Sequence, residues 1–366
     1  MANALLDRIK KASKLEYASA LSNSKILGDC DIIKTQIPAL NVCFTGKLDG
    51  GLTSGLTMFA GQSSSFKSNF ALVCVKAYLD KYEDAVCLFY DSEMGSSLQY
   101  FESLGIDTSR VLHLPVTNIE ELKFDLIKQL EEIKRGEHAI IVIDSVGNLA
   151  SKKEVDDTLA EKSSADLTRA KQYKSLVRMC VPILSLKNLP MVVVNHTYDS
   201  MDAFAMGPLS QKIGGGHGWY YGCQNIFITS KSQEKKGTDL VGFNFIINIL
   251  KSRFSRERTK VPITVTFDGG INKWSALLDF ALEAGVVVKP SNGWYQKIDP
   301  ETGEVLDKKY RASETNTEEF WASLLECKQF TDWVENNYQI SHNNLLVEGE
   351  EVNNKPSEQF IAEGMW

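Results

Sequence analysis

The sequence predicts an α/β protein with a mostly parallel central sheet and helices on both of its faces. Short apolar runs rich in β-branched residues recur along the chain, at residues 56–61, 85–91, 110–115, 138–145 and 191–196. Helical patterns lie between them, such as the amphipathic stretch at residues 119–136. Strands that alternate with helices in this way form right-handed βαβ crossovers, which require parallel strands.

The other segments predict additions to this core. Residues 225–253 have the pattern of two strands joined by a polar turn, so we expect an antiparallel extension of the sheet. We divide the chain into an N-terminal helical arm (1–30), a core (31–270), a small α+β C-terminal domain (271–345) and an acidic tail (346–366). The basic helix of the arm is expected over Ala4 to Leu27.

Composition excludes several classes of protein. The 366 residues are 43% hydrophobic and 24% charged, as in ordinary globular proteins. The seven cysteines show no C-x-x-C spacing, so we expect neither a disulfide framework nor a zinc site, and we expect a cytoplasmic protein. No secretion signal or membrane-spanning run is predicted, so a membrane is not an expected partner.

The net charge of −7 is unevenly distributed. From Arg311 to Trp366 there are eleven acidic and three basic residues, so the rest of the chain is close to neutral. The acidic end is either plain solvated surface or a flap that competes with DNA for basic surface elsewhere. The net charge therefore does not exclude a nucleic-acid partner.

The stretch "AGQSSSFKSNF" (60–70) has the form of a phosphate-binding loop, G-x-x-x-x-G-K-[ST], except that Phe66 replaces the second glycine. In such loops backbone N–H groups wrap a phosphate, the lysine reaches its oxygens and the hydroxyl binds Mg²⁺. Gly61, Lys67 and Ser68 fit these roles. The other loop residues expected to contact a nucleotide are Ser64, Ser65, Phe66 and Asn69. The alternative is a serine-rich turn before a helix, because the β-carbon of Phe66 crowds the loop.

Two predicted strands end in acidic residues suited to phosphoryl chemistry. Asp144 closes an apolar run, and we expect it to hold a metal at the sheet edge rather than only cap the following turn. Glu93 follows the run at 85–91 and is the candidate general base for water. Asp91 in the same turn is the rival candidate, and a solvated loop glutamate is the alternative for Glu93.

Tyr100 and His196 are candidates for nucleotide contacts. Tyr100 lies on a predicted helix, where it would stack on adenine or simply pack. His196 ends the run "MVVVNH", where it would contact a terminal phosphate or form an ordinary hydrogen bond. The long segment after it, 197–218, is either a functional loop or disordered.

Basic residues gather in two places. No acid lies within residues 167–198, where Arg169 and Lys171 are among five bases. The second cluster, "KSRFSRERTK", begins at Lys251 and includes Arg253. The alternatives are the solvated side of a helix for the first cluster and a protective sheet edge for the second.

Together these segments resemble the RecA-type recombinases, and most closely the UvsX recombinases of large tailed phages. The resemblance covers nearly the whole chain and rests on the loop quoted above and on "DAVCLFYDSEMG", "IVIDSVGNLASKKE", "VVVNHTY" and "SRFSRERTKVPITVTFDGGI". In the UvsX group the residue before the loop's lysine is also Phe. The resemblance therefore implies a RecA-like P-loop ATPase core that binds ATP and Mg²⁺.

The resemblance also implies roles for individual residues. Besides the phosphate-loop residues and the adenine-stacking Tyr100, it places Asp144 on the metal-water carboxylate and Glu93 on the residue that activates water. His196 falls on a nucleotide-sensing position, where RecA itself has glutamine. Lys251 and Arg253 match two bases that reach the neighbour's ATP, so the site would be composite and hydrolysis would require assembly.

DNA contacts are implied for two loops, at about 151–165 and 197–218. The first is only mildly basic, so we give more weight to the second and to Arg169 and Lys171. The residues of the second loop expected to contact DNA are Phe204, Met206, Lys212, Gly214 and Gly215. The N-terminal arm is expected to dock on the adjacent protomer.

The function implied is an ATP-dependent recombinase that forms helical filaments on single-stranded DNA and exchanges strands with homologous double-stranded DNA. Mediator and single-strand-binding proteins are further expected partners, in the host cytoplasm if the chain is phage-encoded. One alternative is a hexameric helicase motor, which normally carries an N-terminal primase-binding domain that the first residues are too few to supply. The other is a non-catalytic ATP-binding mediator, against which the retained Lys67, Glu93 and Asp144 argue.

Overall fold

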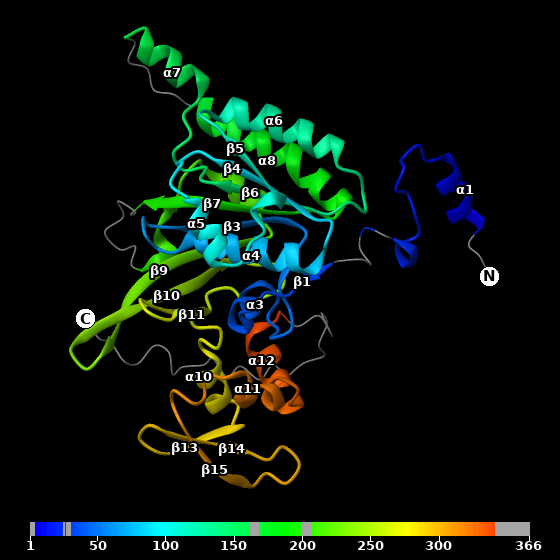
Figure 1. Ribbon diagram of the computed structural model, residues 1–366. Helices are drawn as coiled ribbons and strands as arrows, with labels where there is room; N and C mark the ends of the chain where they lie inside the picture. The colour runs from blue at the N-terminus through cyan, green and yellow to red at the C-terminus, as the bar shows by residue number, and fades with distance from the viewer. Residues whose placement is uncertain (1–3, 25, 27–30, 162–167, 199–206, 341–366) are drawn as a thin grey trace.

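The computed structural model describes residues 4–24, 26, 31–161, 168–198 and 207–340. A large mixed sheet forms its centre, with helices on both faces, and a smaller sheet lies beyond it with the C-terminal helices (Figure 1). The predicted α/β class, with a mostly parallel sheet and a small C-terminal α+β domain, is confirmed. Among the described residues, no helix combines the length and the apolarity that crossing a bilayer requires.

Six neighbouring strands of the large sheet are parallel. Their spatial order is β9 (Asn225–Lys236), β3 (Gly55–Gly61), β7 (Pro190–Tyr198), β6 (Ala139–Asp144), β4 (Val86–Asp91) and β5 (Val111–Pro115). The antiparallel extension continues from β9 through β10 (Asp239–Lys251), β11 (Lys260–Thr266) and β12 (Gly270–Ile271). The short strand β8 (Lys212–Ile213) pairs antiparallel with the end of β7. The hairpin predicted at 225–253 is therefore confirmed.

Helices cover both faces of this sheet. Helix α4 (Lys67–Lys81) packs against β3, β6 and β7 on one face, while α6 (Ile119–Glu132) and α8 (Thr168–Lys187) pack together on the other (Figure 1). Two clusters of buried side chains result, and adjacent residues of β3 contribute to different ones: Phe59 to the α4 side and Met58 to the α8 side. This alternation is the two-residue period of a strand that is buried on both faces.

Shorter elements complete the part of the chain that precedes the C-terminal domain. They are α3 (Pro38–Thr45), α5 (Leu98–Ser103), α7 (Lys152–Leu159), α9 (His217–Gly222), the 3₁₀ turns η1 (Leu21–Asn23), η2 (Thr108–Arg110) and η3 (Pro208–Ser210), and the separate strand pair β1 (Ile32–Ile33) and β2 (Leu52–Thr53). Part of the segment predicted as a loop at 151–165 is thus the helix α7. The Ser151 hydroxyl caps it by accepting a hydrogen bond from the Glu154 N–H.

The aromatic side chains of the C-terminal domain pack around Trp321. Its elements are α10 (Leu277–Glu283), β13 (Val287–Ser291), β14 (Trp294–Ile298), β15 (Val305–Arg311), α11 (Glu318–Leu325) and α12 (Lys328–Tyr338). Trp321 is almost fully buried against Trp274, Phe320 and Phe330. These side chains belong to the same apolar cluster as those of α4, and α12 contacts α3. The predicted acidic tail lies outside the described residues.

The N-terminal helix is shorter than predicted. Helix α1 spans Ala4–Ala12, and the turn η1 follows it at Leu21–Asn23. The Ser13 hydroxyl accepts a hydrogen bond from the Leu15 N–H, a local contact that competes with helical hydrogen bonding. None of the α1 residues is buried, and the helix stands apart from the body of the molecule (Figure 1).

Candidate functional site

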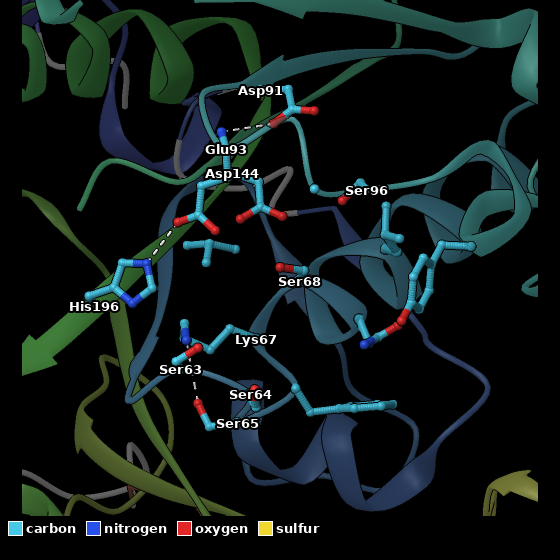
Figure 2. Close-up of a pocket in the computed structure, with 16 residues that line it drawn as sticks. Ser63, Ser64, Ser65, Lys67, Ser68, Asp91, Glu93, Ser96, Asp144 and His196 are labelled. Carbon is cyan, nitrogen blue, oxygen red and sulfur yellow. Dashed lines mark hydrogen bonds and ion pairs between the residues drawn. The ribbon is translucent and has the colours of Figure 1, made fainter. Parts of the chain in front are cut away.

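Parallel pairing brings the ends of four strands together at one edge of the sheet. The register of β3 and β7 places Gly61 beside His196, and that of β4 and β6 places Asp91 beside Asp144. The phosphate loop follows β3, and Glu93 follows β4. Residues predicted from four separate segments therefore line one cavity of about 220 Å³ (Figure 2).

The loop between β3 and α4 is closed by hydrogen bonds. Lys67 Nζ donates to the Gln62 carbonyl at 2.7 Å. The Ser65 hydroxyl donates to the same carbonyl at 2.7 Å and bonds the Thr229 hydroxyl of β9 at 2.8 Å. A β-carbon at Gly61 would lie 2.5 Å from the Thr229 carbonyl oxygen, so only glycine fits there. The loop is thus held by β9 as well as by the strand it follows.

The loop has the charge and the donors that a phosphate requires. Helix α4 begins at Lys67, directly after the loop, and the first turn of a helix carries N–H groups without partners inside the helix. Burial lowers the pKa of the Lys67 amine, and the Glu93 and Asp144 charges oppose that shift. Among the described residues, no three His, Cys, Asp or Glu side chains are grouped as metal ligands. A divalent cation here would take some of its oxygen ligands from a phosphate and from water, as Mg²⁺ usually does.

Asp144 is the carboxylate best placed to hold such a cation. It ends β6, and only 6% of the residue is exposed. Burial raises the pKa of its carboxyl to about 6, a shift that a hydrogen bond with the Ser68 hydroxyl opposes and that the Glu93 and Asp91 charges increase. The Asp144 carboxylate and the Ser68 hydroxyl therefore offer neighbouring oxygens at the start of α4.

Glu93 is held by side chains from two other segments. One carboxylate oxygen accepts hydrogen bonds from the Ser145 hydroxyl, from Asn148 Nδ2 at 3.1 Å and from His196 Nε2 at 2.7 Å. Burial opposes ionisation of Glu93, but the hydrogen bonds from Ser145 and His196 and the charge of Lys67 lower its pKa on balance. Glu93 is thus an ionised carboxylate at the cavity wall, able to accept a hydrogen bond from water.

Asp91, the rival candidate, supports the turn that carries Glu93. Its Oδ1 accepts hydrogen bonds from the backbone N–H groups of Glu93 at 3.1 Å and Met94 at 2.7 Å. Its Oδ2 lies 3.2 Å from His113 Nε2 on β5, and only 4% of its side chain is exposed. Because both oxygens are used within the fold, the geometry favours Glu93 over Asp91 as the base.

A second, larger cavity adjoins the first. Phe66, Asn69 and Tyr100 line both cavities, and the larger one measures about 510 Å³. Gly269, directly before β12, and Gly270, its first residue, also line the larger cavity. Tyr100 is 51% exposed on α5, so a flat ligand can reach its ring. The pair of cavities therefore suits a nucleotide whose phosphates lie in the loop and whose base lies beside Tyr100.

Lys251 and Arg253 lie at and just beyond the end of β10. Neither is among the described residues that line the phosphate cavity of the same chain. Lys251 Nζ donates a hydrogen bond to the Tyr220 carbonyl at 2.5 Å. It also lies 5.1 Å from the centre of the Tyr220 ring. Burial lowers the pKa of the Lys251 amine. A single chain therefore does not bring these two bases to its own phosphate loop.

The segment that contains β8 is tied to the strand end that carries His196. Lys212 of β8 pairs with the end of β7, and the Gly214 N–H donates to the His196 carbonyl at 3.1 Å. Gly215 has a φ of +83°, and a β-carbon there would lie 2.7 Å from Trp219 Nε1. Lys212, Gly214 and Gly215, which are predicted to contact DNA, thus belong to the segment that is bonded to the end of β7.

The other residues predicted to contact DNA differ in accessibility. Arg169, at the start of α8, donates a hydrogen bond to the Gly147 carbonyl. Lys171 is exposed on the same helix. Phe204 and Met206 lie outside the described residues. Of the residues predicted to contact DNA that the structure describes, Lys171 and Lys212 are exposed cations.

Comparison with known proteins accounts for nearly the whole chain. The family described as "RecA N-terminal domain" matches residues 5–272. The chain belongs to the RecA family. A second family, "Bacteriophage T4, Recombination and repair protein, C-terminal domain", matches residues 274–334.

Individual relatives agree with this membership of the RecA family. The chain is 45% identical to the "Recombination and repair protein" of Enterobacteria phage T4, over 97% of this chain and 92% of that protein. It is 24% identical to "Protein RecA" of Malacoplasma penetrans, over 67% of this chain and 72% of that protein. It is 23% identical to "Protein RecA" of Clostridioides difficile, over 80% of each. The resemblance inferred from the motifs is confirmed.

Several polar residues of this RecA-family site were not predicted from the sequence. Ser145 and Asn148 hold the Glu93 carboxylate, and His113 contacts Asp91. Ser145 directly follows Asp144, so its position at the sheet edge could have been inferred from the strand. Asn148 and His113 carry no local signal, because their contacts depend on how the turn after β4 folds.

Replacing Asp144 by Asn should stabilise the protein at pH 7 when metal and nucleotide are absent. Burial raises the pKa of this carboxyl from 3.8 to about 6, so its ionised form is less favourable in the folded state. The protonated carboxyl makes its full contribution to the stability of the folded state below about pH 4. This contribution is lost as the pH rises through about 6. We expect a gain of the order of 2 kcal/mol at pH 7 and almost none near pH 4.

Urea unfolding in the presence of a chelator at both pH values measures this effect. Asp156→Asn on the exposed face of α7 is the matched control and should show no such dependence on pH. An equal effect of Asp144→Asn at the two pH values would contradict the burial argument.

Proposed function

We propose that this chain is an ATP-dependent DNA recombinase, which forms helical filaments on single-stranded DNA and exchanges strands with homologous double-stranded DNA. The observation that carries the proposal is a single cavity that joins a phosphate loop, a buried carboxylate and a hydrogen-bonded glutamate. The relative from phage T4, 45% identical, is a "Recombination and repair protein". The proposed reaction is ATP hydrolysis stimulated by DNA, in recombination, repair and recombination-dependent replication.

The phosphate loop binds the ATP phosphates in this proposal. Lys67 and the N–H groups at the start of α4 offset the phosphate charge. Ser68 and Asp144 hold Mg²⁺ through oxygen ligands and water, and the bound ion neutralises charge that develops in phosphoryl transfer. Asn69 and Tyr100 contact the nucleoside, since both line the second cavity.

Glu93 orients the attacking water and accepts its proton. Its lowered pKa keeps it ionised at neutral pH, and Ser145, Asn148 and His196 fix its orientation. His196 also carries the carbonyl that accepts the hydrogen bond from the Gly214 N–H. A terminal phosphate that draws His196 away from Glu93 therefore changes the segment proposed to contact DNA.

Assembly completes the site. Lys251 and Arg253 act at the ATP site of a neighbouring protomer, which accounts for their absence from the cavity of their own chain. Hydrolysis then depends on the filament, because no isolated chain holds the full set of charges. The arm docks on the neighbour through α1, whose apolar residues Leu5, Leu6 and Ile9 are exposed.

DNA lies against the segment after β7 and the start of α8. In this proposal Lys212 and Lys171 contact the DNA backbone, beside Arg169, Gly214 and Gly215. Phe204 and Met206, which lie outside the described residues, are the further proposed contacts. The base sequence is read by pairing between strands, and the protein supplies charge and stacking. Single-strand-binding and mediator proteins of the host cytoplasm are the further proposed partners.

The roles of the two acids can be separated by substitution. Glu93→Gln keeps an oxygen that accepts hydrogen bonds from Ser145 and Asn148, so it should change ATP binding little and lower the melting temperature less than Asp91→Ala does. It should lower DNA-stimulated hydrolysis by about 100-fold or more, because the base is lost. Asp91→Ala should lower the melting temperature as well as hydrolysis, because the turn loses its hydrogen bonds to Glu93 and Met94. Steady-state ATPase rates with single-stranded DNA and thermal melts measure both. Equal rates for Glu93→Gln and the unaltered protein would exclude Glu93 as the base.

A mixing experiment tests the composite site. Glu93→Gln and the double variant Lys251→Ala, Arg253→Ala should each be nearly inactive alone. In an equal mixture, about a quarter of the head-to-tail interfaces would join an intact Glu93 to intact Lys251 and Arg253. DNA-stimulated hydrolysis should therefore return to roughly that fraction of the normal rate.

The control mixes Glu93→Gln with a variant that carries Glu93→Gln, Lys251→Ala and Arg253→Ala together, which restores no complete interface. No recovery in the first mixture, with filaments formed, would contradict the contribution of Lys251 and Arg253 in trans.

A further inference from the structure

Phe66 occupies a backbone conformation that side chains rarely adopt. It has φ +67° and ψ +17° in the phosphate loop, immediately before α4. This left-handed region is readily available to glycine, whereas a β-carbon makes it unfavourable. Phe66 therefore needs a compensating interaction in order to hold the loop in this shape.

The ring of Phe66 lies between two other phenylalanines. It stacks on Phe245 of β10 with ring centres 4.6 Å apart and an angle of 21° between the planes. It also meets Phe70 of α4 edge to face, at 5.3 Å and 76°. Both geometries are favourable for aromatic pairs. The phosphate loop is thus contacted by α4, the helix that follows it, and by β10 in the antiparallel part of the sheet.

These rings belong to a longer row. Phe70 stacks on Phe59 of β3 at 5.6 Å. On the other side, Phe245 meets Phe243 at 6.2 Å. Phe59 and Phe70 are fully buried, so this end of the row is fixed in the core. The row therefore connects the left-handed residue of the loop to buried side chains of β3, α4 and β10.

We propose that Phe66 is a positioning residue for nucleotide binding: its stack on Phe245 stabilises the left-handed turn that directs Lys67 and the start of α4 into the phosphate cavity. The inference rests on the proposed function, because it takes ATP as the ligand of that cavity. Phe66 also lines both cavities, so a displaced ring would alter the wall beside Tyr100. The aromatic stack thus replaces the conformational freedom that glycine gives at this position in the usual motif.

Substitutions at Phe66 separate backbone strain from stacking. Phe66→Ala keeps the β-carbon and loses the stack, so ATP affinity should fall by roughly tenfold or more. Phe66→Gly loses the stack but also removes the strain, so its affinity should lie between those of Phe66→Ala and the unaltered protein. The measurement is equilibrium binding of a fluorescent ATP analogue with Mg²⁺, accompanied by thermal melts without nucleotide.

A double-mutant cycle then tests the partner. Phe245→Leu should weaken binding roughly three- to tenfold in the unaltered protein and have little effect in the Phe66→Gly background. Phe243→Leu is the matched control, since Phe243 contacts Phe245 in the row and has no ring contact with Phe66 among the described pairs. It should leave the affinity within about twofold.

The outcomes distinguish the inference from the function on which it rests. If Phe66→Ala and Phe66→Gly have the same affinity for ATP as each other, Phe66 is a packing residue and the inference is wrong. The same holds if Phe245→Leu weakens binding equally in the unaltered protein and in the Phe66→Gly background. Should Phe66→Ala not fold, the Phe66→Gly and Phe245→Leu cycle still decides it. Failure of the unaltered protein to bind ATP would instead refute the proposed function, and this inference with it.

Discussion

The registers of the parallel strands β3, β7, β6 and β4 are the constraint on which the site depends. They place Gly61 beside His196 and Asp91 beside Asp144, at strand ends that are far apart in the sequence. A shift of one residue in either register would turn the side chains to the other face of the sheet. The apolar clusters on both faces fix these registers, so the core determines the geometry of the cavity.

Several features of the site are unfavourable for the folded chain by itself. A lysine is buried, the pKa of Asp144 is raised by burial, and Phe66 has a left-handed backbone. Strain and desolvated charge of this kind persist where the surrounding structure holds them in place. Here a bound phosphate and cation would relieve the charge, and aromatic packing offsets the strain. Ligand binding and stability are thus linked through the same residues.

Much of this account could be predicted from the sequence, since local signals carry it. The strand, loop and helix around Lys67, the acids at the ends of two strands, and the change to antiparallel pairing all have recognisable patterns. The contacts of Asn148 and His113 could not be predicted, because they depend on tertiary folding of a turn. The sequence does not explain how Phe66 is accommodated either, since its partner Phe245 is distant in the chain. The roles proposed for Lys251 and Arg253 involve a second protomer, which the sequence of one chain does not describe.

The central claim is that nucleotide binding at this edge of the sheet drives assembly on DNA. Electron microscopy of the protein on single-stranded DNA, with a slowly hydrolysed ATP analogue and Mg²⁺ or without nucleotide, tests it most directly. The account predicts open helical filaments only when the nucleotide is present. Closed rings would indicate a helicase motor, and no assembly would indicate an ATP-binding mediator; either result would contradict the recombinase proposal.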